Sequence, residues 1–259
     1  MLSTLTSYRQ IAKDVDRALE LKASEAVNAR DTAYFEENIK SIETIDEFLG
    51  DTRIYNYAMK AFGLDDMIFA KAYMRKVLEE GVTDENSFAN KLLDERFKEF
   101  ATAFDFKGYG TATTVRAEAT TEIVEKFNRL ALETDAGEDN EGVRLALYFN
   151  RKVSEIDSYY DILGDKALTA FFQTTFGLPE TMSSIDVDQQ VKILEKVFDL
   201  SVLQDPEEVE HLTQRFAIMY DMENEEMSDP ILNLFSAGGS QPSIDEGLLL
   251  TLQTLKLGG

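Results

Sequence analysis

The sequence predicts an all-α fold made of two tandem helical repeats, with amphipathic helices at both ends of the chain. Its composition favours helices: the 259 residues include only 4 Pro and 14 Gly, and 44% are apolar, which is enough to bury a core. Apolar residues recur every three or four positions along most of the chain, which is the helical period. The tripeptides at 49–51 and 62–64 recur unchanged at 163–165 and 176–178, at an offset of 114 residues.

The two repeated segments, 49–64 and 163–178, are each expected to contain one short helix. Sequence motifs typical of helix starts and stops flank that helix. Leu-Gly-Asp ends one helix and begins the next, because an Asp at the N-cap accepts hydrogen bonds from the free N–H groups of the first turn. Phe-Gly-Leu ends the repeated helix, because Gly enters the left-handed region at little cost and the following Leu covers the last turn. We therefore interpret Phe-Gly-Leu as a helix stop rather than a docking loop. The same offset also relates Arg30 to Arg144, residues 34–35 to 148–149, and Ile42 to Ile156.

The first helix is expected over residues 3–27. Leu5, Tyr8 and Val15 belong to an apolar stripe with steps of three or four residues, as in a coiled coil. Such a stripe either pairs with a partner or with the chain's own C-terminus, or packs on the domain behind it. The periodicity leaves both alternatives open, so these residues are candidates for partner binding.

The rest of the chain is predicted to alternate helices and short breaks. Helices are expected at 29–49, 51–62 and 65–81, from a cap at 83–84 onwards, and at 97–104 and 115–133. After the acidic turn, one helix is expected to end near residue 160, and others at 165–176, 186–198 and 205–222. In the helix 65–81, Met67, Phe69, Tyr73 and Met74 are assigned to the buried face. Breaks are expected at 107–111, at the acidic turn 135–142 and at 221–229. The predicted domains are 1–112 (N-terminal helix and first repeat), 113–226 (second repeat) and 227–259.

The C-terminal segment is predicted to be a linker followed by an amphipathic helix. Residues 236–242 are rich in Gly and Ser, and a capping box formed by Ser243 and Glu246 begins a helix to about residue 257. Leu248, Leu252 and Leu255 lie on its apolar stripe and are further candidates for partner binding. The helix can bind a groove in another protein or pack on its own chain, and the second alternative is favoured because a lone apolar helix lowers solubility.

The charge and the absence of some residue types exclude several functional classes. The net charge of -23 disfavours binding to nucleic acids and to anionic membranes, so neither nucleic-acid binding nor membrane insertion is expected. With no cysteine, the chain has no disulfide, thiolate metal site or Cys nucleophile. No apolar run is long enough for a membrane span, and no signal peptide is visible.

No catalytic, cofactor-binding or metal-binding residues are predicted. The single histidine, His211, lacks the partners of a zinc site or a catalytic triad, and we expect it at a surface or helix interface. The acidic segments at 135–142 and 221–229 lack the ligand spacing of an EF-hand. The chain contains no phosphate-binding loop, dinucleotide fingerprint or nucleophile elbow.

Several motifs resemble one known family over nearly the whole chain. They are LTSY at 5–8, IDEFL at 45–49, NYAMKAFGL at 56–64, FAKA at 69–72, RKVLEEG at 75–81 and GVRLALYF at 142–149. In this order they resemble the alphaproteobacterial domain of unknown function numbered twelve-seventeen. Members of that family are often encoded among flagellar basal-body and motor genes. The resemblance implies no catalytic residues and a non-enzymatic role associated with the flagellum.

Three functional hypotheses follow. The first is a non-enzymatic structural or interaction protein of flagellar assembly or function, with other proteins, among them flagellar components, as partners. It is expected in the cytoplasm as an assembly factor, or exported to the flagellum as an axial part. The alternative is a helical module that binds a small molecule or has a regulatory role, with a pocket between the repeats. The third, a hydrolase that uses only carboxylates, requires two buried carboxylates in one cleft.

Overall fold

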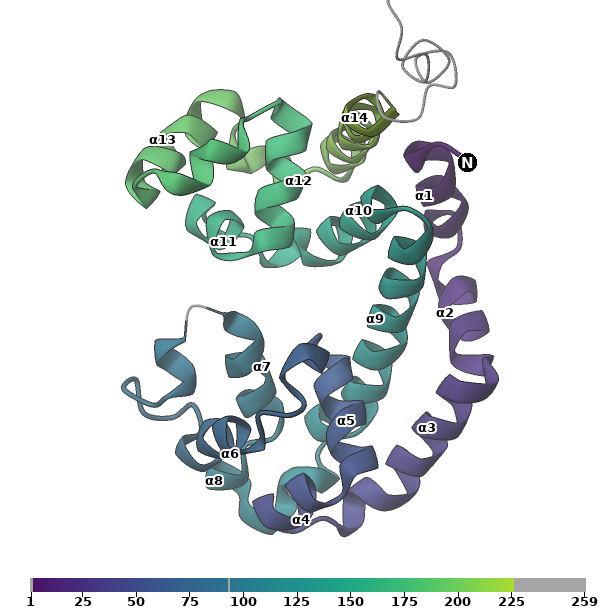
Figure 1. The fold of residues 1–259 in the computed structure, drawn as a ribbon, viewed down its shortest axis with the longest axis vertical. Coiled ribbons are helices and arrows are strands. Elements are labelled where there is room, and N and C mark those ends of the chain that lie inside the picture. Colours follow the sequence, from purple (N-terminus) through teal and green to yellow (C-terminus); the bar gives the residue numbers. More distant parts are fainter. Residues whose placement is uncertain (1, 93, 226–259) are drawn as a thin grey trace, which may run out of the picture. The chain divides into compact units, whose positions relative to one another are not determined.

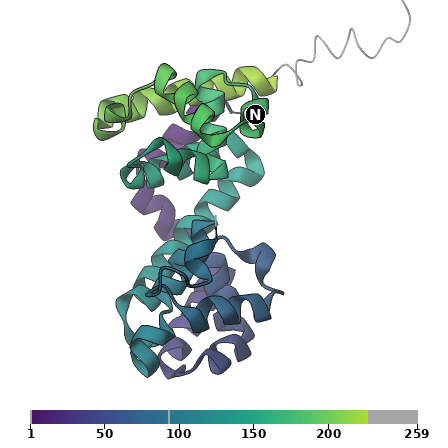
Figure 2. The ribbon, with the colours of Figure 1, turned by 90° about the vertical axis from the view of Figure 1, so that its left-hand side faces the viewer.

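The computed structural model describes residues 2–92 and 94–225, and the regular structure in these residues is helical throughout (Figures 1 and 2). The predicted all-α fold class is therefore confirmed for this part of the chain. The contacts group Met1–Tyr220 into one compact unit and Asp221–Gly259 into a second, of which only the helical residues 221–225 are described. None of the helices in the described residues is both long and apolar enough to cross a membrane.

The N-terminal segment forms consecutive helices rather than the single helix predicted over 3–27. They are α1 (Thr4–Ala12), α2 (Val15–Ser24) and α3 (Ala26–Asn38). The first break occurs because Asp14, with φ -153°, leaves the helical region and caps α2 by accepting a hydrogen bond from the Arg17 N–H. The second occurs at Glu25, where ψ is 136°. Apolar spacing alone did not reveal these breaks, because the stripe continues across them.

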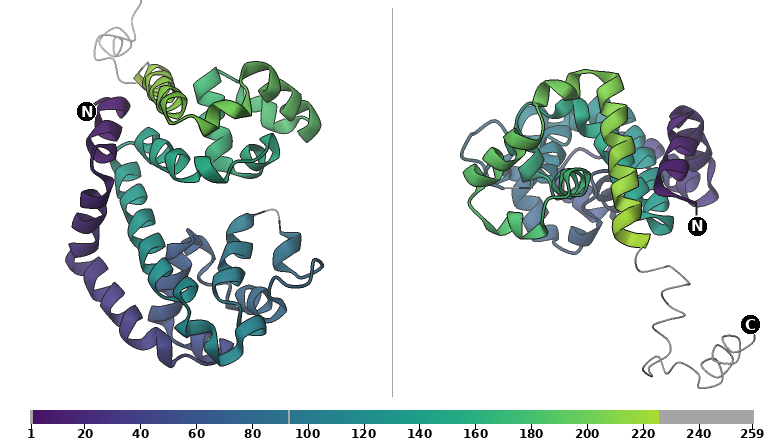
Figure 3. Two further views of the ribbon diagram at one scale, coloured as in Figure 1. Left: turned by 180° about the vertical axis from the view of Figure 1, so that it is seen from behind. Right: turned by 90° about the horizontal axis from the view of Figure 1, so that it is seen from above.

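The α2 helix lies beside α9 (Thr121–Asp139), and α3 packs against α5 (Thr52–Ala61) (Figures 1 and 3). An ion pair between Lys22 and Asp135, 2.9 Å long, joins α2 to α9. The remaining elements up to α9 are η1 (Ile39–Ser41), α4 (Ile45–Gly50), η2 (Asp65–Met67), α6 (Lys71–Glu80), η3 (Ala89–Lys91), α7 (Glu95–Ala103), α8 (Phe106–Tyr109), η4 (Gly110–Val115) and η5 (Ala117–Ala119).

The chain after α9 contains α10 (Glu141–Lys152), η6 (Val153–Glu155), α11 (Tyr159–Gly164), α12 (Lys166–Phe176), η7 (Glu180–Ser184), α13 (Val187–Val197), η8 (Leu200–Gln204) and α14 (Pro206–Glu225). The helices predicted at 165–176, 186–198 and 205–222 are confirmed within a few residues.

Several of the predicted boundaries are wrong. The helix expected at 29–49 is interrupted at residues 42–44, where Thr44 caps α4, and the break expected at 107–111 is helical, within α8 and η4. The helix expected from the cap at 83–84 is instead a series of turns with one short 3₁₀ segment, because the Asp84 carboxylate accepts from the Asn86 N–H and closes a local turn. The acidic turn expected at 135–142 is helical apart from Asn140, which caps α10 by accepting from two backbone N–H groups. Helix α14 also continues through residues 221–225, where an acidic break was expected. The predicted linker at 236–242 and the helix at 244–257 lie outside the described residues.

Helices α4 and α5 begin with the same kinds of N-cap as α11 and α12, which lie 114 residues later. Thr44 forms a capping box at the start of α4, and Ser158 forms one at the start of α11. Asp51 accepts from two backbone N–H groups at the start of α5, and Asp165 does the same for α12. Each of these caps satisfies orphan donors in a first turn, so the sequence signals act locally as predicted.

The ends of α5 and α12 are also equivalent. Gly63 and Gly177 have φ values of 66° and 61°, in the left-handed region. The N–H groups of Leu64 and Leu178 each donate to the carbonyl five residues earlier, which is the bond that defines a Schellman motif. The interpretation of Phe-Gly-Leu as a helix stop therefore agrees with the backbone geometry.

One apolar core forms around α5. Tyr57 is buried there and stacks on both Phe35 of α3 and Phe127 of α9, with ring centroids 4.5 and 4.0 Å away. Stacked aromatic pairs of this kind add to the free energy gained by burial of the rings. The core therefore joins α3, α5 and α9.

A second apolar core forms around α12. Phe171, 114 residues after Tyr57, stacks on Phe149 of α10 and on Phe216 of α14, with ring centroids 4.0 and 4.4 Å away. Tyr8 of α1 is part of this core too. The N-terminal helix therefore packs with elements that lie far along the sequence.

Candidate functional site

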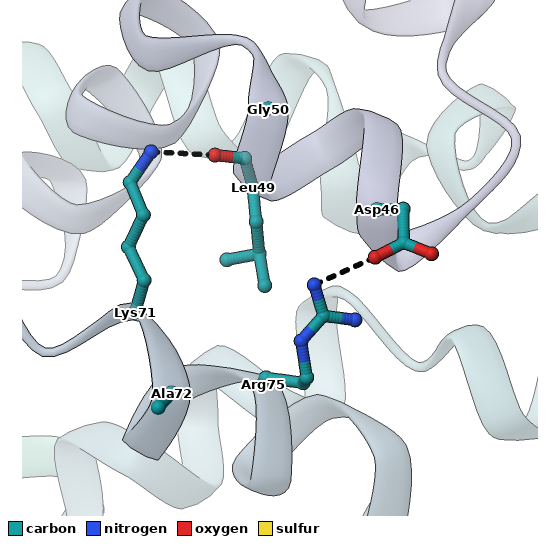
Figure 4. Close-up of a pocket in the computed structure, with 6 residues that line it drawn as sticks. All are labelled: Asp46, Leu49, Gly50, Lys71, Ala72 and Arg75. Carbon is teal, nitrogen blue, oxygen red and sulfur yellow. Dashed lines mark hydrogen bonds and ion pairs between the residues drawn. The ribbon is translucent and has the colours of Figure 1, made fainter.

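A pocket of about 320 Å³ lies between α4 and α6 and is the candidate site (Figure 4). It is lined by Asp46, Leu49, Gly50, Lys71, Ala72 and Arg75. Gly50 ends α4, and Lys71 begins α6, so the pocket is formed where one helix ends and another starts. Lys71 and Arg75 lie four residues apart on α6, which places both cations on one face of that helix. We call this site the α4–α6 pocket.

Lys71 is the cation of the pocket that lacks an acidic partner. Its Nζ donates to the Leu49 carbonyl at 2.6 Å (Figure 4). The same nitrogen lies 5.3 Å from the centroid of the Tyr55 ring. Within the described residues, no carboxylate lies within ion-pair distance of this ammonium group. The bond to Leu49 satisfies one of the carbonyls that the end of α4 leaves without a helical partner. Lys71 therefore has a structural role and still carries an uncompensated charge.

Arg75 lies across the pocket and forms an exposed ion pair. Its guanidinium contacts the Asp46 carboxylate at 2.6 Å and the Glu79 carboxylate at 3.6 Å. The side chains of Arg75 and Asp46 are 40% and 80% exposed. An ion pair this accessible to water contributes little to stability. Arg75 is therefore held only weakly by Asp46.

Phe69 precedes the pocket and is the most exposed of the large apolar side chains in the described residues, at 83%. The sequence assigned it to a buried helical face, and that assignment is wrong. The helix expected from residue 65 is only a 3₁₀ turn there, and α6 does not begin until Lys71. Residues 68–70 therefore lie outside the helical periodicity, and Phe69 faces solvent. Helix periodicity could not identify this residue, because it assumed one continuous helix.

A second pocket, of about 360 Å³, is lined mainly by charged residues. They come from α7, η5, α9 and η6, and only Phe62 and Ala103 among the lining residues are apolar. Glu99 in this pocket accepts from Lys152 at 2.9 Å and from Lys126 at 3.4 Å. Desolvation favours the protonated carboxyl, but the two lysines outweigh it and lower the pKa of Glu99.

Of the residues predicted to bind partners, the three that the structure describes, Leu5, Tyr8 and Val15, line neither pocket. Tyr8 is only 3% exposed, and burial together with the nearby Glu210 raises its pKa to about 12. Leu5 and Val15 are half-buried on α1 and α2. The packing of Tyr8 favours the alternative in which the N-terminal stripe contacts its own chain. Leu248, Leu252 and Leu255 lie outside the described residues.

Among the residues that the structure describes, no two buried carboxylates lie together in a pocket. Glu133 is 1% exposed, but both of its oxygens accept from the guanidinium of Arg151. Asp105 is buried as the N-cap of α8. His211 is exposed, as expected for a surface residue. Across residues 2–92 and 94–225, no group of three or more His, Cys, Asp or Glu side chains is placed to hold a metal ion.

Comparisons with known proteins give one family and one solved structure. A family model described as "Protein of unknown function (DUF1217)" matches residues 61–209. The crystal structure of a protein from Agrobacterium tumefaciens is similar, with 47% sequence identity and a TM-score of 0.79. The match covers 86% of this chain and 97% of the Agrobacterium chain. No curated protein is significantly similar to the chain.

Proposed function

The chain belongs to the DUF1217 family of proteins of unknown function, and we propose that it is a non-enzymatic interaction protein of bacterial flagellar assembly or function. The observation that carries the proposal is the exposure of Phe69 beside the cationic α4–α6 pocket. Aromatic and arginine side chains are the residues that contribute most to binding energy in protein interfaces. This surface combines both types, and Leu49 and Ala72 are the apolar side chains that line the pocket.

The flagellar part of the proposal is supported by resemblance alone. The motifs of this chain resemble a family whose members are often encoded among flagellar genes, and gene neighbourhood is an associational argument. The net charge of -23 supports a protein partner over a nucleic acid.

A deletion strain tests the proposal. We expect it to swim poorly or to carry fewer filaments, and the wild-type gene to restore both. A gene encoding Phe69→Ser should fail to restore them at equal protein level. The matched control is Val27→Ser on α3, since Val27 is also exposed, at 60%, but lies on another element. Normal swimming and normal filament number in the deletion strain would contradict a flagellar role.

Cell fractionation separates the two forms of the proposal. An assembly factor should remain in the cytoplasm, whereas an axial part should co-purify with hook and basal-body complexes. If the protein never leaves the cytoplasm, the axial form is wrong and the assembly form stands.

The alternative is a helical module that binds a small molecule or has a regulatory role. The volume of the second pocket supports it. About 360 Å³ lies within the range of small-molecule pockets, which is about 300–1,000 Å³. Its charged lining differs from the mostly apolar lining of such pockets, so the interaction function is favoured. A metabolite that raises the melting temperature of the wild type but not of Lys126→Ala would favour the alternative.

A further inference from the structure

We propose that the α4–α6 pocket binds a carboxylate side chain of a protein partner, while an apolar neighbour of that carboxylate packs on Phe69. The inference rests on the proposed interaction function and adds the chemistry of the partner segment. The segment is acidic, with an Asp or Glu one to a few residues from a large apolar side chain.

Lys71 provides the first contact. An ammonium group has three N–H donors, and the structure uses one of them, for the Leu49 carbonyl. This acceptor is neutral, so the positive charge is not compensated. A carboxylate that enters the pocket would supply the missing partner without breaking the contact with Leu49.

Arg75 provides the second contact. Its present partner, Asp46, is 80% exposed, and an exposed ion pair contributes little free energy. A partner carboxylate can therefore replace Asp46, or share the guanidinium, at low cost. Guanidinium and carboxylate groups form paired hydrogen bonds that fix the orientation of the acid. Figure 4 shows the side chains of Lys71 and Arg75 rising from α6 toward α4, with that of Leu49 between them.

Phe69 explains why the occupant is a protein segment rather than a free anion. It lies two residues before Lys71, so their Cα atoms are at most about 7 Å apart. A free anion would use the two cations and leave this 83% exposed ring in water. A peptide that carries an acid beside an apolar side chain uses the cations and the ring together.

Peptide display on the immobilised full-length protein tests the inference. The probe is a random library of 12-residue peptides, and the affinity of enriched peptides is then measured by fluorescence anisotropy. We expect enriched peptides with an Asp or Glu close to an aromatic or large aliphatic residue. Lys71→Ala should weaken their binding about tenfold or more, since a hydrogen bond to a charged group is lost. Arg75→Gln should weaken it as well, and it leaves the bond between Lys71 and Leu49 intact.

Lys76→Ala is the matched control. Lys76 lies on the same helix, but it faces Glu80 and the ring of Phe88 instead of the pocket. This variant should bind the peptides as tightly as the wild type. Higher ionic strength should weaken the binding of peptides to the wild type more than to Lys71→Ala, because the charge contact is screened.

Several results would overturn the inference. Enriched peptides without an acidic residue, an absence of enrichment, or binding unaffected by Lys71→Ala and Arg75→Gln would each show that the pocket does not bind a partner carboxylate. Inorganic phosphate that binds as tightly as the peptides would identify a free-anion site instead. If Phe69→Ser abolishes binding while both cation variants retain it, the pocket inference is wrong and the proposed interaction function is retained.

Discussion

The hydroxyl of Tyr148 donates a hydrogen bond to the carboxylate of Asp165, the residue that caps α12. The same relationship occurs 114 residues earlier, where Tyr34 donates to Asp51, the cap of α5, at 2.8 Å. In each case a tyrosine from an earlier helix, α3 or α10, fixes the carboxylate that caps α5 or α12, and one short α-helix lies between the two. The two segments therefore share this contact between a tyrosine and a capping carboxylate at the 114-residue offset.

Replacement of Tyr148 by Phe is expected to lower the free energy of unfolding by about 2 kcal/mol, because a hydrogen bond to a charged cap is lost. Tyr34→Phe should have a smaller effect in the same direction. Chemical denaturation of both variants measures the change in the free energy of unfolding. Equal stability of Tyr148→Phe and the wild type would show that the cap does not depend on the tyrosine.

Replacement of Gly63 by Ala is expected to destabilise the protein by about 1 kcal/mol or more, because Ala disfavours positive φ. A Cβ atom at this position would lie 3.5 Å from the nearest atom of Leu130, which is ordinary contact, so backbone strain is the expected cause. Gly50→Ala is the control, since nothing lies within 4 Å of its Cβ position and its φ is not positive. An unchanged melting temperature for Gly63→Ala would contradict the left-handed cap.

Replacement of Glu99 by Gln is expected to change how stability depends on pH. Lys152 and Lys126 overcome the effect of burial and lower the pKa of Glu99 in the folded protein below its ordinary value of 4.5. A lowered folded pKa contributes stability above the unfolded pKa, and this contribution is lost as the pH falls through the folded pKa. The wild type should therefore lose more stability than Glu99→Gln below about pH 4.5.

Melting temperatures between pH 7 and pH 3 measure this difference. Glu122→Gln is the control, because Glu122 lines the same pocket but has no ion pair within the described residues. Parallel pH profiles for the wild type and Glu99→Gln would show that the lysine contacts do not stabilise the fold.

Replacement of Tyr8 by Ala is expected to cost about 2–4 kcal/mol, because it leaves a cavity in the core around α12. Circular dichroism during thermal unfolding measures the loss. A variant as stable as the wild type would show that α1 detaches from its own chain in solution, which would favour the alternative in which the N-terminal stripe pairs with a partner.

The sequence predicted the elements that depend on local chemistry. Asp51, Asp165, Gly63 and Gly177 act at short range, and their roles follow from hydrogen bonding to adjacent turns and from backbone strain. The boundaries at Asp14 and Asn140 were missed, because the apolar stripe and the acidic composition there gave no sign that a single side chain would cap a new helix.

The candidate pocket is formed by contacts between residues far apart in the sequence. The spacing of apolar residues along the chain does not predict such contacts. The contact between Lys71 and the Leu49 carbonyl joins residues 22 positions apart. Phe69 is a large apolar residue at a spacing that is typical of a core position. It is exposed to solvent because α6 does not begin until Lys71.

Site-specific photo-crosslinking in living cells most directly tests the central claim that the chain binds another protein through the surface around Phe69. A photoreactive phenylalanine analogue is placed at position 69 and, in a separate strain, at position 27 on α3. We predict a covalent adduct with an identified flagellar component from position 69, weakened by Lys71→Ala, and none from position 27. No adduct from position 69, or the same adducts from both positions, would contradict the claim.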